Sequence, residues 1–376
     1  MEIEQAHWTG SAGWNPAPAM PEAQLALIFG GSEQLTPGRL DELRAHYPNA
    51  ILLGCSTSGE IMDTRVYDDS VAVTAVTFAN TRLGLARQTV AESGASRRAG
   101  AALAGELLAA DLRHVFLLSD GLGVNGTELV EGLKSVLPSG IEVTGGLSGD
   151  GTRFQRTLVI ADGPAQAGQI AALGFYGEAL RVGFGSLGGW DPFGPDRLIT
   201  RARGNVLYEL DGQSALALYK KYLGEHAAGL PATGLLFPLA LSATPNARAG
   251  LVRTILAVDE TSQSMTFAGD MPVGMYARLM KANFDRLVEG AAGAAEDSKH
   301  RLAGSRPDLA ILISCVGRKL VLKQRIEEEV EAVRDILGPH AALTGFYSYG
   351  EISPYAPTAR CELHNQTMTI TSFGEG

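Results

Sequence analysis

The chain has 376 residues, of which 45% are hydrophobic and 19% are charged, so it should bury about two cores and is not disordered. Its 31 basic residues against 41 acidic ones give a net charge of −10. Because no basic run offsets this charge, neither nucleic acid nor an anionic membrane surface is an expected partner.

The lack of a recognisable targeting signal and the small number of cysteines both predict a cytoplasmic location. The first twenty residues contain two glutamates and no apolar run, unlike a secretory signal. No stretch approaches the roughly 20 apolar residues of a membrane span. Three cysteines provide no disulfide framework and suit a reducing compartment. We therefore expect a soluble cytoplasmic protein.

The first predicted elements form a strand, a helix and a glycine-rich end. The strand covers residues 25–29 ("LALIF") and the helix residues 37–47. The run "AILLGCSTSGEI" (50–61) then places Gly54 five residues before the pair Gly59-Glu60. Backbone freedom and a negative charge thus lie together where a strand is expected to end.

The same order of elements occurs twice more in the chain. A strand at 114–121 and a helix at 127–137 precede "IEVTGGLSGDG", a looser copy that ends in Asp150. A strand at 309–315 and a helix at 323–337 precede "LTGFYSYGEI", in which Gly345 stands five residues before Gly350-Glu351. Each strand–helix–strand unit predicts parallel pairing through a right-handed crossover.

Segments between these units complete the predicted fold. Four runs have strand character and should pair antiparallel, and two further helices are expected: strands at 70–78, 156–162, 251–260 and 366–373, and helices at 214–224 and 272–299. The prediction is a mixed α/β (α+β) fold of two related domains, with mixed sheets and the helices packed outside.

The Gly/Pro-rich segment 184–197 is the best boundary candidate. It divides the chain into an N-terminal tail (1–22), a first domain (23–195) and a second domain (196–376).

The glycine motifs are candidates for ligand binding because ligands of α/β sheets tend to lie beyond the carboxyl ends of strands. The first glycine would let the chain leave the strand, and the second would let the backbone approach a guest. The acid would accept a hydrogen bond from an ammonium group or a hydroxyl. The alternative is that each motif only makes a turn in which the acid binds a neighbouring amide.

Several of these segments together resemble the FIST family, named for F-box and intracellular signal transduction. They are "LLGCSTSGEI", "VTGGLSGDGTRF", "VLYELDGQSALALYKKYLG" and "LTGFYSYGEISP" followed by "CELHNQTMTI". The first two are similar to the FIST N-terminal domain and the last two to the FIST C-terminal domain, over roughly residues 20 to 373. The resemblance implies a sensory module for small ligands such as amino acids. It also implies a signalling partner such as a histidine kinase, because the chain shows no output segment.

The expected ligand-binding residues come from the strand ends of both halves, and their loops are expected to converge at the domain interface. They are Cys55, Ser56, Ser58 and Glu60 from the first half, Tyr347, Tyr349, Glu351, His364 and Asn365 from the second, with Asp120 and Asp150 as added candidates.

Two other functions stay open. Some bacterial members of the family that, like this chain, consist of the FIST domains alone are described as haem-binding nitric-oxide sensors. His364 would be the axial ligand of such a haem. Its neighbour Cys361 has metal-ligand spacing, but residues three apart in a strand point to opposite faces. The second alternative is an enzyme in which Cys55 is a nucleophile on a strand-end turn. We expect a binding protein and no enzyme.

Overall fold

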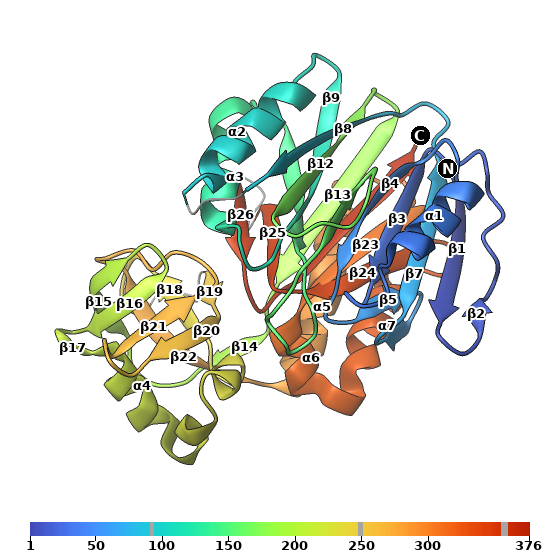
Figure 1. The fold of residues 1–376 in the computed structure, drawn as a ribbon. Helices are drawn as coiled ribbons and strands as arrows, with labels where there is room; N and C mark the ends of the chain where they lie inside the picture. Colours follow the sequence, from blue (N-terminus) through green and yellow to red (C-terminus); the bar gives the residue numbers. More distant parts are fainter. Residues whose placement is uncertain (91–93, 247–250, 355–359) are drawn as a thin grey trace.

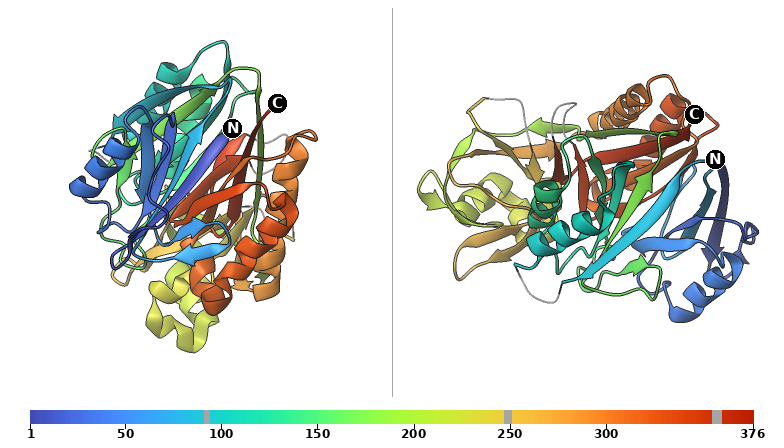
Figure 2. Two further views of the ribbon diagram at one scale, coloured as in Figure 1. Left: turned by 90° about the vertical axis from the view of Figure 1, so that its right-hand side faces the viewer. Right: turned by 90° about the horizontal axis from the view of Figure 1, so that it is seen from above.

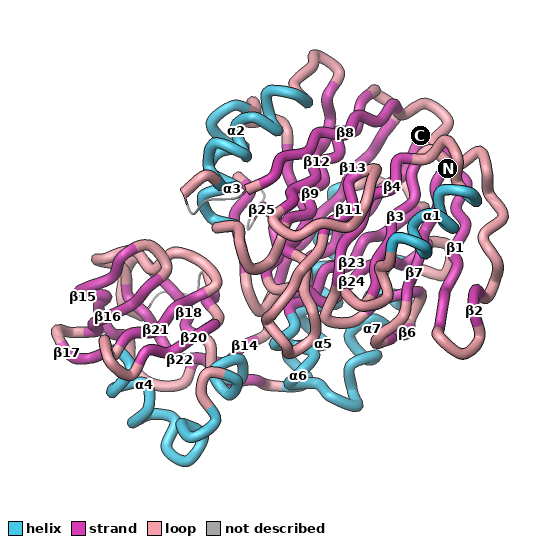
Figure 3. Tube along the Cα trace, in the orientation of Figure 1, coloured by secondary structure: helices cyan, strands magenta, loops and turns pink. Residues whose placement is uncertain are grey.

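The computed structural model describes residues 1–90, 94–246, 251–354 and 360–376. In these residues the strands form three six-stranded sheets and a fourth sheet that stands to one side (Figure 1). The predicted mixed class, with strand–helix–strand units and helices outside, is confirmed (Figure 3). No helix in the described part of the chain is long and apolar enough to cross a membrane.

The first sheet is built on the first predicted unit. Its strands β3 and β4 are parallel, as the crossover requires, and α1 joins them. The sheet has the order β11-β4-β3-β7-β1-β2. The bounds are β1 (Glu2–Thr9), β2 (Gly13–Trp14), β3 (Leu25–Gly30), α1 (Pro37–His46), β4 (Ile51–Ser56), β7 (Val71–Thr77) and β11 (Val159–Ala161). Residues 1–22, set apart in the sequence, thus contribute β1 and β2 to this sheet.

The second sheet repeats the plan around a parallel pair of β9 and β10, joined by α3. Its order is β26-β25-β10-β9-β12-β8, and α2 and α3 cover its outer face. The bounds are β8 (Arg82–Thr89), α2 (Ser96–Leu107), β9 (Leu112–Ser119), α3 (Gly126–Val136), β10 (Glu142–Leu147), β12 (Gln169–Tyr176), β25 (Gly350–Pro354) and β26 (Cys361–His364).

The third sheet is built around the parallel pair β23 and β24. Its order is β13-β27-β23-β24-β5-β6, and α5 and α7 pack against its outer face. The bounds are β5 (Glu60–Met62), β6 (Arg65–Tyr67), β13 (Leu180–Leu187), α5 (Phe284–Arg301), β23 (Leu309–Cys315), α6 (Val316–Leu322), α7 (Ile326–Leu337), β24 (Ala342–Ser348) and β27 (Met368–Glu375).

A short strand passes from each unit to the sheet of another unit. After β4, the chain crosses to the third sheet, where β5 pairs with β24. After β24 it crosses to the second sheet, where β25 pairs with β10. After β10 it crosses to the first sheet, where β11 pairs with β4. The three units therefore form a closed ring.

The outer strands follow the same ring. The positions beside β7, β12 and β27 are taken by β1, β8 and β13. The chain runs from β7 into β8 and from β12 into β13, and its two ends lie close together after β27 and before β1 (Figure 1). The N-terminal ammonium group is 3.9 Å from a carboxylate oxygen of Glu375.

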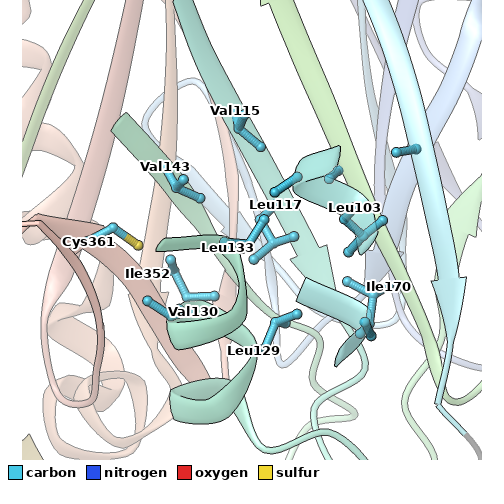
Figure 4. Packing of buried hydrophobic residues seen from close by; sticks show 14 of the residues in the cluster. Leu103, Val115, Leu117, Leu129, Val130, Leu133, Val143, Ile170, Ile352 and Cys361 are labelled. Carbon is cyan, nitrogen blue, oxygen red and sulfur yellow. The ribbon is translucent and has the colours of Figure 1, made fainter. Parts of the chain in front are cut away.

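Alternation along the central strands gives each sheet two apolar faces. The inner faces meet in one core, to which β3, β9 and β24 contribute Phe29, Phe116 and Phe346. The rings of Phe29 and Phe346 lie 4.8 Å apart. The outer faces carry the helices, and Figure 4 shows Val115 and Leu117 of β9 under α3. Burial on both faces explains why these strands are continuous apolar runs.

The fourth sheet, with the strands and helix between β13 and α5, forms a small domain with its own core (Figures 1 and 2). Its elements are β14 (Trp190–Pro192), β15 (Arg197–Arg203), β16 (Val206–Leu210), β17 (Gln213–Ser214), α4 (Ala215–Leu223), β18 (Leu239–Ser242), β19 (Val252–Arg253), β20 (Ile255–Asp259), β21 (Ser264–Phe267) and β22 (Tyr276–Ala282). The residue boundaries proposed from the sequence stay a prediction.

The predicted helix 272–299 is wrong over its first part, because β22 occupies residues 276–282 and α5 begins only at Phe284. Leu279 of β22 packs into the core of the small domain and Met280 packs against the main body. A strand with both faces covered has no period-two pattern, so its apolar residues fit a helix equally well. The predicted strand 251–260 is likewise divided into β19 and β20.

Segment 363–366, part of the "CELHNQT" run, joins the small domain to the main body. Gln366 donates from Nε2 to the Leu235 carbonyl and to Thr254 Oγ1, both at 3.0 Å. Arg253 Nη1 donates to the Leu363 carbonyl at 2.9 Å. These are buried hydrogen bonds across the boundary between the two parts, so the segment fixes how the small domain is attached.

Candidate functional site

The first glycine of each motif lies inside a strand and not at its exit. A Cβ at this position would stand 1.8 or 1.9 Å from a carbonyl oxygen of the neighbouring parallel strand: Gly54 against Ile28, Gly145 against Leu117 and Gly345 against Leu312. The opposite neighbour is in each case an isoleucine of the strand received from another unit: Ile160, Ile352 and Ile61. The repeated glycine therefore allows close strand pairing at the crossing.

The second glycine has different roles in the first and third copies. Gly59 has φ +136°, and a Cβ there would come 2.4 Å from Lys319 Nζ. Gly350 is not among the glycines of positive φ, and a Cβ there would meet Leu147 and Leu363 side chains at 3.0 Å. The guest that approaches Gly59 is thus a lysine from the chain itself.

The two glutamates of the motifs bind equivalent groups. Glu60 accepts hydrogen bonds from the Thr57 hydroxyl and from the N–H and hydroxyl of Ser70, the latter two at 3.2 and 2.6 Å. Glu351 accepts from the Ser348 hydroxyl at 2.6 Å and from the N–H and hydroxyl of Thr367 at 3.1 and 3.0 Å. Each carboxyl group thus ties a crossing strand to the start of β7 or β27.

The acids of the second unit are arranged differently. Asp150 accepts hydrogen bonds from its own loop, at the N–H groups of residues 154, 155 and 156, and from the Tyr349 hydroxyl. Asp120 instead accepts from the N–H of Gly168, the residue before β12, at 3.1 Å. Asp120, and not Asp150, thus shares with the two glutamates the contact with the residue before an antiparallel strand. Asp120 differs from them because it follows the central strand β9 and also accepts from the N–H groups of Leu122 and Gly123 and from the Thr157 hydroxyl.

Burial sets the protonation of these groups. Desolvation raises the pKa of Glu60 to about 7, against hydrogen bonds from Ser70 and Thr57 that favour the carboxylate. It raises the pKa of Glu351 to about 7 in the same way. Burial also opposes ionisation of Asp150, but the Tyr349 hydroxyl and three backbone N–H groups outweigh it and hold the pKa below its usual range. Glu60 and Glu351 are therefore partly protonated near neutral pH.

A cavity of about 350 Å³ opens where the ends of β4, β10 and β23 meet. We name it the strand-end cavity. Three carboxyl groups and two basic side chains line it, together with hydroxyl groups and glycine backbone; the residues are Gly31, Thr57, Ser58, Gly59, Glu60, Asp68, Asp69, Gly151, Thr152, Arg153, Val316, Lys319 and Leu320. Its Lys319 donates to the Ser58 carbonyl at 2.9 Å and forms an ion pair with Asp68.

A second cavity of about 570 Å³ lies between the second sheet and the small domain, and we name it the interdomain cavity. It is lined by Gly94, Ser96, Gly121, Leu122, Gly123, Val124, Asn125, Glu128, Leu147, Arg203, Gly204, Asn205, Leu256, Phe267, Ala268, Gly269 and Tyr349. Tyr349 links the two sites, because its hydroxyl binds Asp150 and the carbonyl of Gly151, which lines the strand-end cavity.

The structure brings only some of the predicted residues to a cavity. Ser58 and Glu60 line the strand-end cavity, and Tyr349 lines the interdomain cavity. The others bind groups of the chain: Ser56 the Gly149 carbonyl, Tyr347 Glu329, and Asn365 the Tyr349 carbonyl, while Asp120, Asp150 and Glu351 make the contacts given above. Neither cavity is lined by both Glu60 and Glu351.

His364 does not have the surroundings of a haem ligand. It is buried, its Nε2 lies 2.8 Å from the Ser353 carbonyl, and it lines neither cavity. Burial lowers its pKa to about 4, so the imidazole is neutral. Within the described residues, no three His, Cys, Asp or Glu side chains are placed to hold a metal ion. The residues around His364 therefore do not fit a haem.

Cys55 is equally unsuited to attack a substrate. Its side chain belongs to the inner core shared by the three sheets and is fully buried. Burial raises the pKa of the thiol well above its ordinary value, so the nucleophilic thiolate is disfavoured.

The two basic residues of the strand-end cavity, Arg153 and Lys319, were not among the residues predicted from the sequence. Arg153 lies three residues after Asp150, and Lys319 lies four after the end of β23. A useful signal was available, since ligands gather beyond the carboxyl ends of all the central strands and not only those followed by an acid.

Comparisons with known proteins support the resemblance. Models of the FIST N domain and the FIST C domain match residues 24–213 and 215–354. No similar protein was found among curated sequences. A chorismatase structure aligns over 99% of this chain and 98% of its own, with 10% identity and a TM-score of 0.35. A cyanuric acid hydrolase from A. caulinodans aligns over 100% and 98%, with 10% identity and a TM-score of 0.38. Likenesses this distant carry no argument about function.

Proposed function

The chain belongs to the FIST family, and from this premise we propose that it is a sensory protein that binds an amino acid or a related polar metabolite in the strand-end cavity. The observation that carries the proposal is the charge of that cavity. Glu60, Asp68 and Asp69 face the same space as Arg153 and Lys319. A ligand with both an ammonium and a carboxylate group would find partners for both.

The dimensions of the cavity suit such a ligand. Its volume of about 350 Å³ lies at the lower end of the range of small-molecule sites, about 300–1,000 Å³. Glu60 is held in place by three hydrogen bonds, so its position is fixed before a ligand arrives. A cationic group that binds beside it would favour its ionised form.

Thermal shift and calorimetry with amino acids and amines test the proposal. A ligand that binds only the folded state raises the melting temperature with its concentration. We expect Glu60→Gln or Lys319→Met to weaken binding by about 10- to 100-fold, the loss of a hydrogen bond to a charged group. Lys221→Met, which removes a lysine exposed on α4, is the control and should not change affinity. A panel without any ligand that stabilises the wild type would exclude this function.

A protein partner completes the proposal. The family is associated with signal transduction, and a binding module must pass its state to another protein. By resemblance we propose a signalling protein such as a histidine kinase, in the cytoplasm, where the three buried thiols would stay reduced. Affinity capture with candidate kinases, with and without ligand, should show a complex whose yield depends on the ligand. Equal absence of a complex in both states counts against the partner.

A further inference from the structure

We propose that the interdomain cavity is a second binding site, for a neutral planar heterocycle of the nucleobase class, as the free base or its nucleoside. This site is separate from the strand-end cavity and does not depend on the function proposed there. Its volume of about 570 Å³ lies well inside the range of small-molecule sites. One wall belongs to the second sheet and the other to the small domain.

Two asparagines on opposite walls carry the argument. Asn125, before α3, accepts a hydrogen bond at Oδ1 from the Glu128 N–H. Asn205, in the turn between β15 and β16, donates from Nδ2 to the Phe267 carbonyl at 2.8 Å. A backbone N–H only donates and a carbonyl only accepts, so these partners fix which end of each amide is which.

The other end of each amide is left for a ligand. For Asn125 this is the donor Nδ2, and for Asn205 the acceptor Oδ1; among the described residues neither atom has a hydrogen-bond partner, and both side chains line the cavity. One wall thus offers a donor and the other an acceptor. A nucleobase has donors and acceptors in one plane on different edges, and asparagine amides pair with such edges.

The rest of the lining favours a flat and uncharged ligand. Arg203 and Glu128 supply one charge of each sign, so the lining has no net charge, whereas the strand-end cavity has three acids and two bases. Gly94 and Gly204 leave backbone uncovered, since a Cβ at either position would meet nothing closer than 4.0 Å, and this lets a ring approach closely. Leu147 and Leu256 add apolar wall. A ligand held by both asparagines would also connect the small domain to the main body.

Asn125→Asp is the variant that tests the site. Aspartate keeps an acceptor for the Glu128 N–H and is a good helix N-cap, so folding should be unchanged. It replaces the free donor with an acceptor. Asn49→Asp, at an exposed position outside the cavity, makes the same chemical change and is the control.

The probes are adenine, hypoxanthine, uracil and cytosine with their nucleosides, measured by calorimetry on the full chain. We expect at least one to bind the wild type with a Kd below about 1 mM. Binding should weaken about tenfold or more in Asn125→Asp, with an unchanged melting temperature, and should be the same in Asn49→Asp. No binding to the wild type, or equal affinity in Asn125→Asp, overturns the proposal. Loss of binding in Glu60→Gln, with Asn125→Asp unaffected, would assign the ligand to the strand-end cavity instead.

Discussion

Glu60 and Glu351 have equivalent hydrogen-bond partners and different surroundings. Each accepts from a hydroxyl three residues earlier and from the backbone N–H that precedes β7 or β27. Glu60 also lines the strand-end cavity, whereas Glu351 lines neither cavity. The same motif therefore fixes a strand crossing in both copies and faces a cavity only in the first.

The raised pKa of Glu60 predicts a pH-dependent effect of Glu60→Gln. The unfolded carboxyl group ionises near 4.5 and the folded one near 7, so the folded state binds more protons between these values. Ionisation of Glu60 therefore lowers stability as pH rises through this window. Glutamine does not titrate, so the variant should gain on the order of 3 kcal/mol relative to wild type between pH 4.5 and 7, and nothing more above.

Urea unfolding at several pH values measures this difference. Subtracting the wild-type curve removes the opposite slope from His114 and His364, whose lowered pKa values make stability rise with pH. Glu22→Gln changes an exposed glutamate and should give a flat difference. A flat difference for Glu60→Gln as well would show that its carboxyl group titrates normally in the folded protein.

The sequence could predict which residues stand at strand ends, but not where their side chains point. Two of the residues named from the sequence, Ser58 and Glu60, line the strand-end cavity, and their binding of a ligand stays a prediction. It could not show that Cys55 points into the inner core or that Tyr347 binds Glu329, because both depend on which sheet faces which. Lys319 reaches the cavity from a helix 260 residues away from Gly59, a contact for which no local pattern exists.

Among the elements, the parallel strand pairs depend on the absence of a side chain at one position. We expect Gly54→Ala to destabilise the protein by more than about 3 kcal/mol, because the new Cβ would lie 1.9 Å from the Ile28 carbonyl oxygen and force β3 and β4 apart. Gly38→Ala is the control, since a Cβ there meets nothing within 4 Å in α1. Urea midpoints compare the two; equal midpoints would mean that the strand pair adapts to the methyl group.

Helices α6 and α7 are joined by a fully buried ion pair. Arg318 donates to Glu329 at 2.7 Å and to the carbonyls of Gly188 and Leu287. Tyr347 and Ser314 donate to the same carboxylate. Both oxygens of Glu329 are thus occupied by groups of the chain, and neither is left to accept a hydrogen bond from a ligand. This network connects both helices to the third sheet.

Removal of one partner should be costly. Arg318→Met would leave the Glu329 carboxylate buried without its cation, at a cost of about 3–5 kcal/mol. Arg65→Met breaks the exposed pair with Glu327 and should cost less than about 1 kcal/mol. Both are measured as changes in the free energy of unfolding. Similar small losses for the two variants would mean that water hydrates the Glu329 carboxylate, or that a neighbouring group compensates its charge, once Arg318 is removed.

The strand–helix–strand units could be predicted because their strands and helices have local patterns. The errors are equally local in origin: β22 is covered on both faces and fits a helical period, and β5 has only three residues, too few to show any period. The exchange of short strands between sheets is a tertiary property, so it had no signal in the sequence.

At the scale of the whole molecule, three units exchange strands in one direction and the small domain branches from the third. The hydrogen bonds of Gln366 and Arg253 hold that domain at a boundary which also borders the interdomain cavity. The strand-end cavity lies where the three units meet. The two cavities therefore differ in what a ligand would affect: the centre of the ring in one case and the attachment of the small domain in the other.

Because the two chain ends lie side by side, the order in which the strands are connected along the chain can be changed by circular permutation. The joints β7–β8 and β12–β13 are equivalent in the ring to the gap between β27 and β1. A circular permutant that joins Gly376 to Met1 through a short glycine–serine linker, and opens between Gly177 and the exposed Glu178, should fold with the circular dichroism spectrum of the parent. Opening between Leu312 and Ile313, inside β23, should abolish folding. If the first permutant failed to fold, the β12–β13 joint would not be equivalent to the gap between the chain ends; if only the first folds, the same ring can form from more than one starting point of the chain.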